Sequence, residues 1–309
     1  MYKKGFIAYL ESKNLSPITV NKYAVYTEQF LRWEKKEEIQ ISKADVLKYL
    51  EYLKNTRLLG NKTRSLHLLS VKHYFDFLLG EEEIITNPCL FLKIRGTKRK
   101  KLYKIYTSEE LDTLFDSYYQ LFVRGYDYSR ILGNRREQAI LCRERNALML
   151  SFLMYQKVTL GEMEKIEPDD IDLFKATLKI SGCKRSKDRN LPLKASQTGL
   201  LMNYLQNIRP RISEYRTADS DKLFFTLSKK SGDTLQDIFS FIAEQLKTID
   251  KQFVNFKQFR ASTVSYWIKT SGLRKAQYLA GHRYVSSTEN YLSNNMDELK
   301  DDINKLHPF

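Results

Sequence analysis

A dense run of basic residues constrains how this chain can fold. Residues 93–104 read KIRGTKRKKLYK, with seven basic residues in twelve and no acidic one. Like charges at this density cannot be buried together, so the run is either a solvated linker or an arm lying along phosphates. We expect it to be both, in a protein of three parts. These are a helical unit (1–92), a basic linker (93–106) and a second unit (107–309). The DNA-binding candidates in the linker are Lys98, Arg99, Lys100 and Lys101.

Start signals and helical spacing predict four short helices before the linker. Ser16-Pro17 is typical of an N-cap followed by proline in the first turn. Ser42 and Asp45 have the spacing of a capping box, and Asn61 is expected to cap a further helix. Apolar residues follow each signal at intervals of three or four, and Asn87-Pro88 ends the pattern. An all-helical bundle with basic outer faces suits contact with DNA.

Charge and composition narrow the class of partner. The 309 residues carry a net charge of +15, and the sequence pI is about 9.5. Such a balance favours a polyanionic partner, with nucleic acid as the first candidate and an anionic membrane as the alternative. No apolar run approaches the length of a membrane-spanning helix. Three distant cysteines without metal-ligand spacing favour a cytoplasmic protein with no disulfide and no bound metal.

The second unit is predicted to combine helices with a small sheet. Thr107 to Glu110 resembles another capping box, and residues 146–155 form an apolar, buried helix. Alternation over 176–180 and 190–193, around a basic turn at 181–187, predicts a β-hairpin. A further strand is expected at 223–225. Residues 118–145 show no clear periodicity and are not assigned.

Three residues near the C-terminus form a candidate catalytic set. Arg260 offers a fork of donors to phosphate oxygens, His282 can donate near neutral pH, and Tyr291 can form a covalent intermediate. Each has an ordinary alternative: a solvated arginine, a structural histidine, and one of the 20 tyrosines in the chain. Their order and separation distinguish them from such isolated residues, because Arg-Ala-Ser, Leu-Ala-Gly-His and Ser-Ser-Thr-Glu-Asn-Tyr follow one another within residues 260–291.

This arrangement resembles the C-terminal catalytic box of the tyrosine recombinases, the phage-integrase family. The resemblance implies a mainly α protein with a small β-sheet, in which a helical, SAM-like core-binding domain precedes an α+β catalytic domain. In that family the two domains close around duplex DNA as a clamp. The implied reaction is attack of Tyr291 on DNA, with Arg260 and His282 stabilising the phosphorane. No cofactor or metal is required.

The resemblance also assigns roles to the basic hairpin and to the start of the Arg260 helix. The family carries a catalytic lysine on this hairpin; Lys184 aligns with it and Lys187 is the fallback, while Arg185 and Lys187 are expected to contact DNA. Lys257 takes the position of the family's usual histidine in His-x-x-Arg. The same Lys-x-x-Arg spacing occurs in type IB topoisomerases, and Lys257 is expected to contact phosphate.

The chain departs from the family at its first catalytic arginine. Alignment on Glu162 puts Thr159 at that position, and threonine carries no charge. Lys157 or Arg185 can be considered as substitutes, but the sequence does not show that either reaches the site. A charge-assisted contact to the phosphorane is worth roughly 10²–10³ in rate, so this position bears directly on activity.

The expected function is site-specific recombination or integration for a mobile genetic element. The partners are double-stranded DNA and further copies of the chain, as a homotetramer or mixed tetramer on two duplexes. Two alternatives stay open: a weakly active or inactive DNA-binding partner of another recombinase, and, with less support, a type IB topoisomerase. A C-terminal helix at 296–306 is expected either to pass to a neighbouring subunit or to pack on its own domain.

Overall fold

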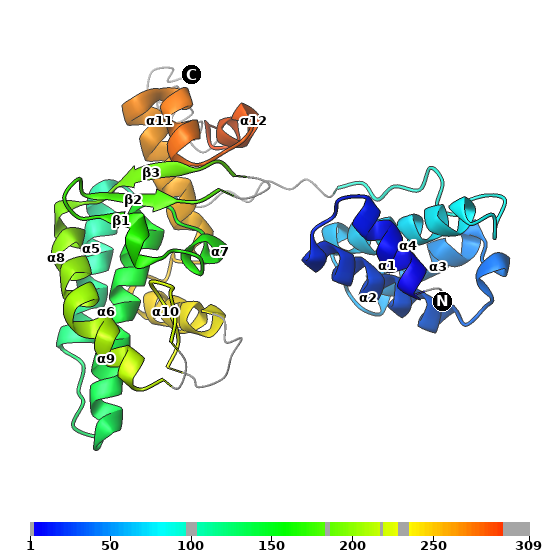
Figure 1. Ribbon diagram of the computed structural model, residues 1–309. Coiled ribbons are helices and arrows are strands. Elements are labelled where there is room, and N and C mark those ends of the chain that lie inside the picture. Colours follow the sequence, from blue (N-terminus) through cyan, green and yellow to red (C-terminus); the bar gives the residue numbers. More distant parts are fainter. Residues whose placement is uncertain (1–2, 97–103, 183–185, 217–218, 228–234, 293–309) are drawn as a thin grey trace, which may run out of the picture. The chain divides into compact units, whose positions relative to one another are not determined.

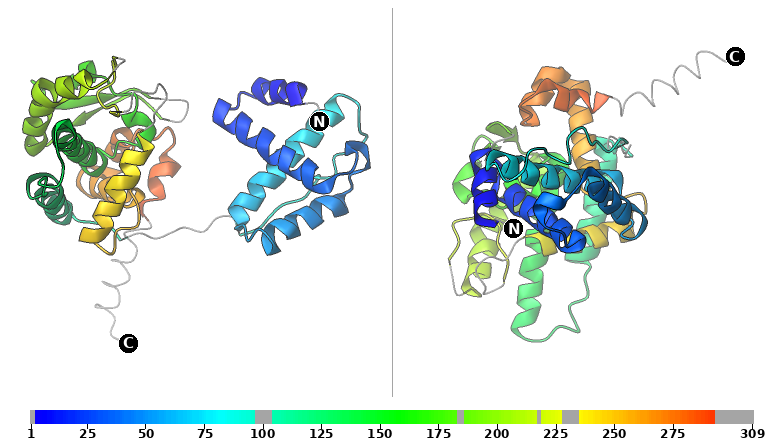
Figure 2. Two further views of the ribbon diagram at one scale, coloured as in Figure 1. Left: turned by 90° about the horizontal axis from the view of Figure 1, so that it is seen from below. Right: turned by 90° about the vertical axis from the view of Figure 1, so that its right-hand side faces the viewer.

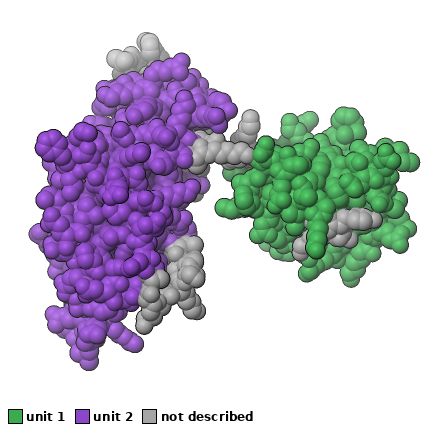
Figure 3. All heavy atoms as spheres, viewed as in Figure 1, with its two compact units in different colours: residues 1–101 green, residues 102–309 purple. Residues whose placement is uncertain are grey.

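The computed structural model describes residues 3–96, 104–182, 186–216, 219–227 and 235–292. It contains two compact units, Met1–Lys101 and Leu102–Phe309 (Figure 3). Each has a hydrophobic core of its own. The linker candidates at 98–101 and the expected helix at 296–306 lie outside the described residues. Within the described residues, no helix is long and apolar enough to cross a bilayer.

Unit 1 consists of four helices, with α2 and α4 crossing one another (Figures 1 and 2). These are α1 (Lys3–Ser12), α2 (Pro17–Glu34), α3 (Lys43–Asn55) and α4 (Asn61–Gly80). Phe6, Phe30 and Tyr74 are fully buried among them. This confirms the helical prediction, because apolar residues recurring at helical spacing gather on one face of each helix and can be buried together.

The predicted starts of these helices are mostly confirmed. The Ser16 side chain accepts from the Thr19 backbone, and Ser42 and Asp45 form the reciprocal capping box that their spacing predicted. Asn61 is a correction, since Gly60 occupies the N-cap and Asn61 is the first residue of α4. The Asn61 side chain instead donates to the Arg95 carbonyl, 2.9 Å away, which ties the helix to the segment leading out of the unit.

Unit 2 is a set of helices beside a small antiparallel sheet in the order β1-β2-β3 (Figure 1). The strands are β1 (Ile171–Asp172), β2 (Thr177–Ile180) and β3 (Arg189–Pro192). The β2–β3 pair is the predicted hairpin, with Leu178 opposite Leu191. The helices are α5 (Ser108–Tyr119), α6 (Asn134–Tyr155), α7 (Leu160–Met163), α8 (Ala195–Asn203), α9 (Arg209–Glu214), α10 (Gln236–Ile249), α11 (Lys257–Leu279) and α12 (Val285–Glu289).

Short turns complete both units. Three-residue 3₁₀ turns lie at Glu38–Gln40 and Pro168–Asp170, and π-helical turns at Gln120–Arg124 and Tyr204–Ile208 extend α5 and α8. The unassigned stretch 118–145 thus contains the end of α5, a π turn, a loop and the first half of α6. That half of α6 and the loop before it project from the body of unit 2 (Figures 1 and 2).

The prediction of a strand at 223–225 is wrong. Leu223, Phe224 and Phe225 are buried, but they form no strand. The Leu223 amide donates to the Ile166 carbonyl, so the segment satisfies its backbone through a loop contact. The apolar side chains of this segment correctly predicted that it is buried. A β-strand must also form hydrogen bonds with the edge of a sheet, whereas this segment forms its contact with a loop.

Candidate active site

The structure brings Arg260, His282 and Tyr291 together. Arg260 lies in the first turn of α11, His282 in the turn after α11, and Tyr291 just after α12. Arg260 Nη2 lies 3.2 Å from His282 Nε2, and Arg260 Nε donates to the Tyr291 hydroxyl at 3.4 Å. The His282 and Tyr291 rings are nearly parallel, with centroids 5.9 Å apart. One guanidinium therefore contacts both the imidazole and the phenol.

The contacts of His282 fix its tautomer. An arginine only donates, so Nε2 must be the acceptor, and Nδ1 carries the proton and donates to Thr288 Oγ1, 2.9 Å away. Burial, followed by the charges of Lys157 and Arg260, lowers the pKa of His282 to about 3. The imidazole is therefore neutral at pH 7 in the protein without DNA, and its Nε2 lone pair faces Arg260 Nη2 and Lys157 Nζ.

The turn before His282 requires glycine. Gly281 has a φ of +64°, and a Cβ there would lie 2.6 Å from Arg189 Nη1. Both conditions exclude a side chain, since the left-handed conformation and the close approach are open only to glycine without strain. The Gly281 carbonyl accepts from the Lys187 amide at 3.2 Å, and Ser186 forms a β-bridge with His282. The basic hairpin is thereby attached directly beside the imidazole.

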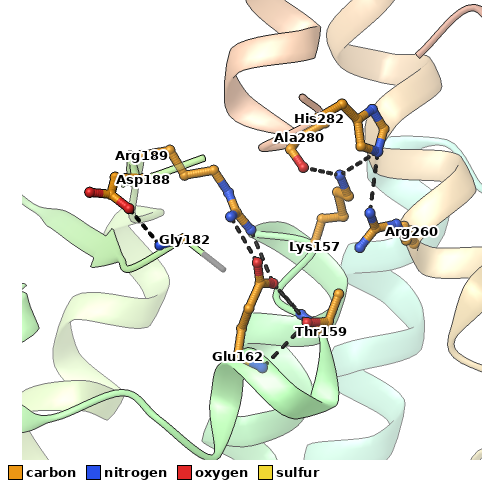
Figure 4. A network of polar contacts seen from close by, with 9 residues as sticks. All are labelled: Lys157, Thr159, Glu162, Gly182, Asp188, Arg189, Arg260, Ala280 and His282. Carbon is orange, nitrogen blue, oxygen red and sulfur yellow. Dashed lines mark hydrogen bonds and ion pairs between the residues drawn. The ribbon is translucent and has the colours of Figure 1, made fainter. Parts of the chain in front are cut away.

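Thr159 is used as a helix cap and supplies no charge to the site. Its hydroxyl donates to Glu162 Oε2 at 2.8 Å and accepts from the Glu162 amide, the reciprocal capping box of α7. Arg189 holds the same carboxylate through Nη1–Oε1 at 2.8 Å and Nη2–Oε2 at 3.1 Å (Figure 4). Burial alone would raise the pKa of Glu162, but the contacts from Arg189 and Thr159 hold it below its ordinary value.

Arg189 is buried, although it follows closely after the basic turn predicted at 181–187. Its side chain is 0% exposed, because residue 189 takes an inward position in β3, where burial alternates. The alternation of Arg189, Asn190 and Leu191 carried this signal, since Leu191 on the same face is a core residue. A buried guanidinium needs a carboxylate partner, and Glu162 provides one.

Lys157 reaches the catalytic set from the turn between α6 and α7. Its ammonium donates to the Ala280 carbonyl at 2.6 Å and lies 3.4 Å from His282 Nε2 (Figure 4). The side chain is 1% exposed, and burial, with the charges of Arg260 and Arg189, lowers its pKa well below the ordinary value. Of the two substitutes considered for the missing arginine, Lys157 is thus beside the site.

The remaining predicted residues fall into two groups. Lys257 begins α11 with an exposed side chain, and it lines an open cavity of about 600 Å³ together with Lys157, Thr159 and Arg260. Its ammonium makes no hydrogen bond or ion pair to any described residue. Lys187 is exposed, and its backbone amide donates to the Gly281 carbonyl. Lys184 and Arg185 lie outside the described residues.

Comparison with known proteins agrees with this geometry. The phage integrase family pattern matches residues 122–298, more than half of the chain, and its N-terminal SAM-like domain matches residues 3–84. The chain belongs to the phage integrase family. This family comprises the tyrosine recombinases, enzymes that break and rejoin DNA. Tyrosine recombinase XerC of Bacillus pumilus (strain SAFR-032) is 25% identical over 312 residues, covering 98% of this chain and 95% of the relative.

Solved tyrosine recombinases share the fold. The XerH site-specific recombinase bound to a palindromic difH substrate matches with a TM-score of 0.67 at 17% identity, covering 96% of this chain and 82% of that one. The Tn1549 transposon integrase in complex with circular intermediate DNA matches with a TM-score of 0.64 at 12% identity, covering 94% of both chains. The predicted fold class, a SAM-like helical domain before an α+β catalytic domain, is confirmed.

Proposed function

We propose that this chain is a site-specific recombinase that cuts and rejoins double-stranded DNA through a 3′-phosphotyrosine at Tyr291. The observation that carries the proposal is the contact of Arg260 with both His282 and the Tyr291 hydroxyl. A nucleophile, an imidazole and a guanidinium within hydrogen-bond reach of one another are the groups that attack on a phosphodiester needs.

The reaction follows from these groups. The Tyr291 hydroxyl gives up its proton to solvent as its oxygen forms a bond to phosphorus. The bond to the 5′ oxygen breaks at the same time, and the leaving oxygen takes up a proton. Lys184 is the proposed donor of that proton. Arg260 and His282 bind the non-bridging oxygens, where negative charge develops. Rejoining reverses the steps, because the phosphotyrosine conserves the energy of the cleaved bond.

His282 must change its protonation before it can donate from Nε2. In the protein without DNA, Nε2 accepts from Arg260 and Lys157, and Nδ1 carries the proton. An entering phosphate brings negative charge, which raises the pKa of a nearby imidazole. Lys157 and Arg260 can then transfer their hydrogen bonds from Nε2 to a phosphate oxygen. This exchange makes the imidazole available as a second donor.

Finer features of this function remain predictions from the sequence. They are the origin of the DNA site in a mobile element, the assembly of four protomers on two duplexes, and the DNA contacts of the linker and the hairpin. The second candidate, a DNA-binding partner with little or no catalysis, is favoured by one observation. Thr159 caps α7 and brings no charge to the site.

Covalent capture tests the proposal. Duplex DNA from the regions flanking the gene is first selected by native gel shift, then nicked beside each candidate cleavage position and incubated with wild type or Tyr291→Phe. Wild type should give a slowed protein–DNA band on a denaturing gel, and Tyr291→Phe should give none while still shifting DNA. Binding by wild type without any trapped complex would support the accessory function instead.

A further inference from the structure

Lys157 occupies a position that local stability does not explain. It has a φ of +56°, in the left-handed region that β-carbon-bearing residues rarely adopt, and its side chain is almost completely buried. Burying an ammonium and holding a lysine in this conformation both cost free energy. Strained backbone and buried charge at one residue are typical of a functional site.

The partners of Lys157 are neutral. Its ammonium has three hydrogens, and its hydrogen-bonding contacts in the described residues are the Ala280 carbonyl and His282 Nε2. The nearby carboxylate, Glu162, is held by both nitrogens of the Arg189 fork. The charged groups that shift the pKa of Lys157 are two cations, Arg260 and Arg189, and one carboxylate, Glu162. The charge around Lys157 is thus positive on balance.

Lys157 and Arg260 lie beside an open space. Lys157 and Arg260 line the same cavity of about 600 Å³, and Thr159 lies on its wall. Both cations also contact the same atom, His282 Nε2, at 3.4 and 3.2 Å. Two donors that converge on one neutral acceptor would bind an anionic oxygen more strongly, because attraction between opposite charges adds to the hydrogen bonds.

We propose that Lys157 Nζ binds a non-bridging oxygen of the scissile phosphate and offsets the negative charge that develops there. This rests on the proposed recombinase function and names the group that fills the role left open by Thr159. The negative charge of the bound phosphate favours the protonated form of Lys157, which keeps its protons throughout the reaction. The Tyr291 oxygen still bonds to phosphorus, and the 5′ oxygen still leaves with a proton from another group. Lys157 is thus a catalytic residue that acts by charge, not by proton transfer.

Other cations are less suited to this role. The Arg189 fork is bound to Glu162, and its side chain is fully buried in that pair. Lys187 is exposed and contacts the site through its backbone. Lys257 lines the cavity, but its side chain is exposed and does not contact His282. Of these, only Lys157 shares with Arg260 the acceptor that a phosphate oxygen would replace.

The test is single-turnover cleavage of nicked DNA by wild type and Lys157→Met, with Lys247→Met as the matched control. Lys247 is a partly exposed lysine on α10 that pairs with Glu244 and takes no part in the site. Each protein receives two substrates, one with an ordinary scissile phosphate and one with a methylphosphonate there. The methyl group replaces a non-bridging oxygen and removes its charge.

Lys157→Met should cleave the ordinary phosphate roughly 10²–10³-fold more slowly than wild type. On one methylphosphonate stereoisomer it should fall within about tenfold of wild type, because the charge that Lys157 offsets is absent. Adding Thr159→Arg to Lys157→Met should restore part of the rate on the ordinary phosphate. Equal losses on both substrates, or no loss on the ordinary phosphate, would overturn the assignment.

A third substrate with sulfur in place of the 5′ bridging oxygen separates charge from proton donation. A thiolate leaves without a proton, so this substrate should not rescue Lys157→Met, and rescue there would make Lys157 the acid instead. Thermal unfolding and gel shifts establish that the variant folds and binds DNA. If wild type trapped no DNA while Lys247→Met behaved identically, the recombinase proposal itself would fail. If wild type and Lys157→Met instead trapped DNA equally, only the assignment of Lys157 would fail.

Discussion

Removal of the Arg189 guanidinium should strongly destabilise unit 2. In Arg189→Met, the Glu162 carboxylate stays largely buried, with a side chain only 13% exposed, and loses both guanidinium contacts. Removing one partner of a buried ion pair costs about 3–5 kcal/mol. Glu162 Oε2 keeps two donors from Thr159, so we expect the lower end, about 3 kcal/mol at pH 7.

The double variant separates the pair from general packing. Arg189→Met with Glu162→Gln leaves no unpaired charge, so its loss should be smaller than that of Arg189→Met alone, with a coupling of about 2 kcal/mol. The pH dependence provides a second check. In wild type the pKa of Glu162 is lowered, and in Arg189→Met burial without the cation should raise it. Protonation then relieves the buried charge, so the deficit should shrink as pH falls from 7 toward the unfolded pKa of Glu, about 4.3.

Urea unfolding monitored by tryptophan fluorescence measures these differences. The chain has two tryptophans, Trp33 in unit 1 and Trp267 buried in α11 of unit 2. A Trp33→Phe background therefore reports on unit 2 alone. Midpoint shifts at constant slope give the change in the free energy of unfolding. A deficit below about 1 kcal/mol, the range of exposed pairs, would refute the reasoning.

Three further outcomes are expected. The pKa of His282 is about 3 in the folded chain, below its unfolded value of about 6.5. The contribution of His282 to the free energy of unfolding is therefore fully present above pH 6.5 and is lost as the pH falls from 6.5 toward 3. His282→Gln should flatten this decline by up to about 1.4 kcal/mol per pH unit in unfolding titrations, and an unchanged slope would contradict it. Gly281→Ala should lose at least about 2 kcal/mol of unfolding free energy, and a loss under about 0.5 would refute the need for glycine. Lys257→Met should slow trapping less than about tenfold, because its charge is exposed, whereas a hundredfold loss would place it beside Lys157.

Local patterns in the sequence predicted the parts of the fold that local interactions determine. The Ser42–Asp45 and Thr107–Glu110 capping boxes formed as predicted, because each needs only residues three apart. The N-cap predicted at Asn61 lies one residue earlier, at Gly60, and the Asn61 side chain donates to the Arg95 carbonyl, 34 residues away. The family box likewise predicted that Arg260, His282 and Tyr291 would meet.

The charges around this set depend on contacts that sequence spacing does not encode. Lys157 is 125 residues from His282 in the chain and meets it only because a left-handed turn after α6 directs it there. The pairing of Arg189 with Glu162 spans 27 residues and depends on the inward register of β3. Such contacts arise from tertiary packing, so the sequence showed the missing arginine at Thr159 without showing the cation beside the site.

Peptide mapping of the trapped complex tests the central claim most directly. Wild type is trapped on nicked DNA, digested with protease and nuclease, and sequenced by mass spectrometry to find the tyrosine that carries the nucleotide. We expect a single adduct at Tyr291, one of 20 tyrosines in the chain, linked to a 3′ phosphate. An adduct on another tyrosine, or a linkage to a 5′ phosphate, would show that Tyr291 is not the nucleophile of the proposed reaction.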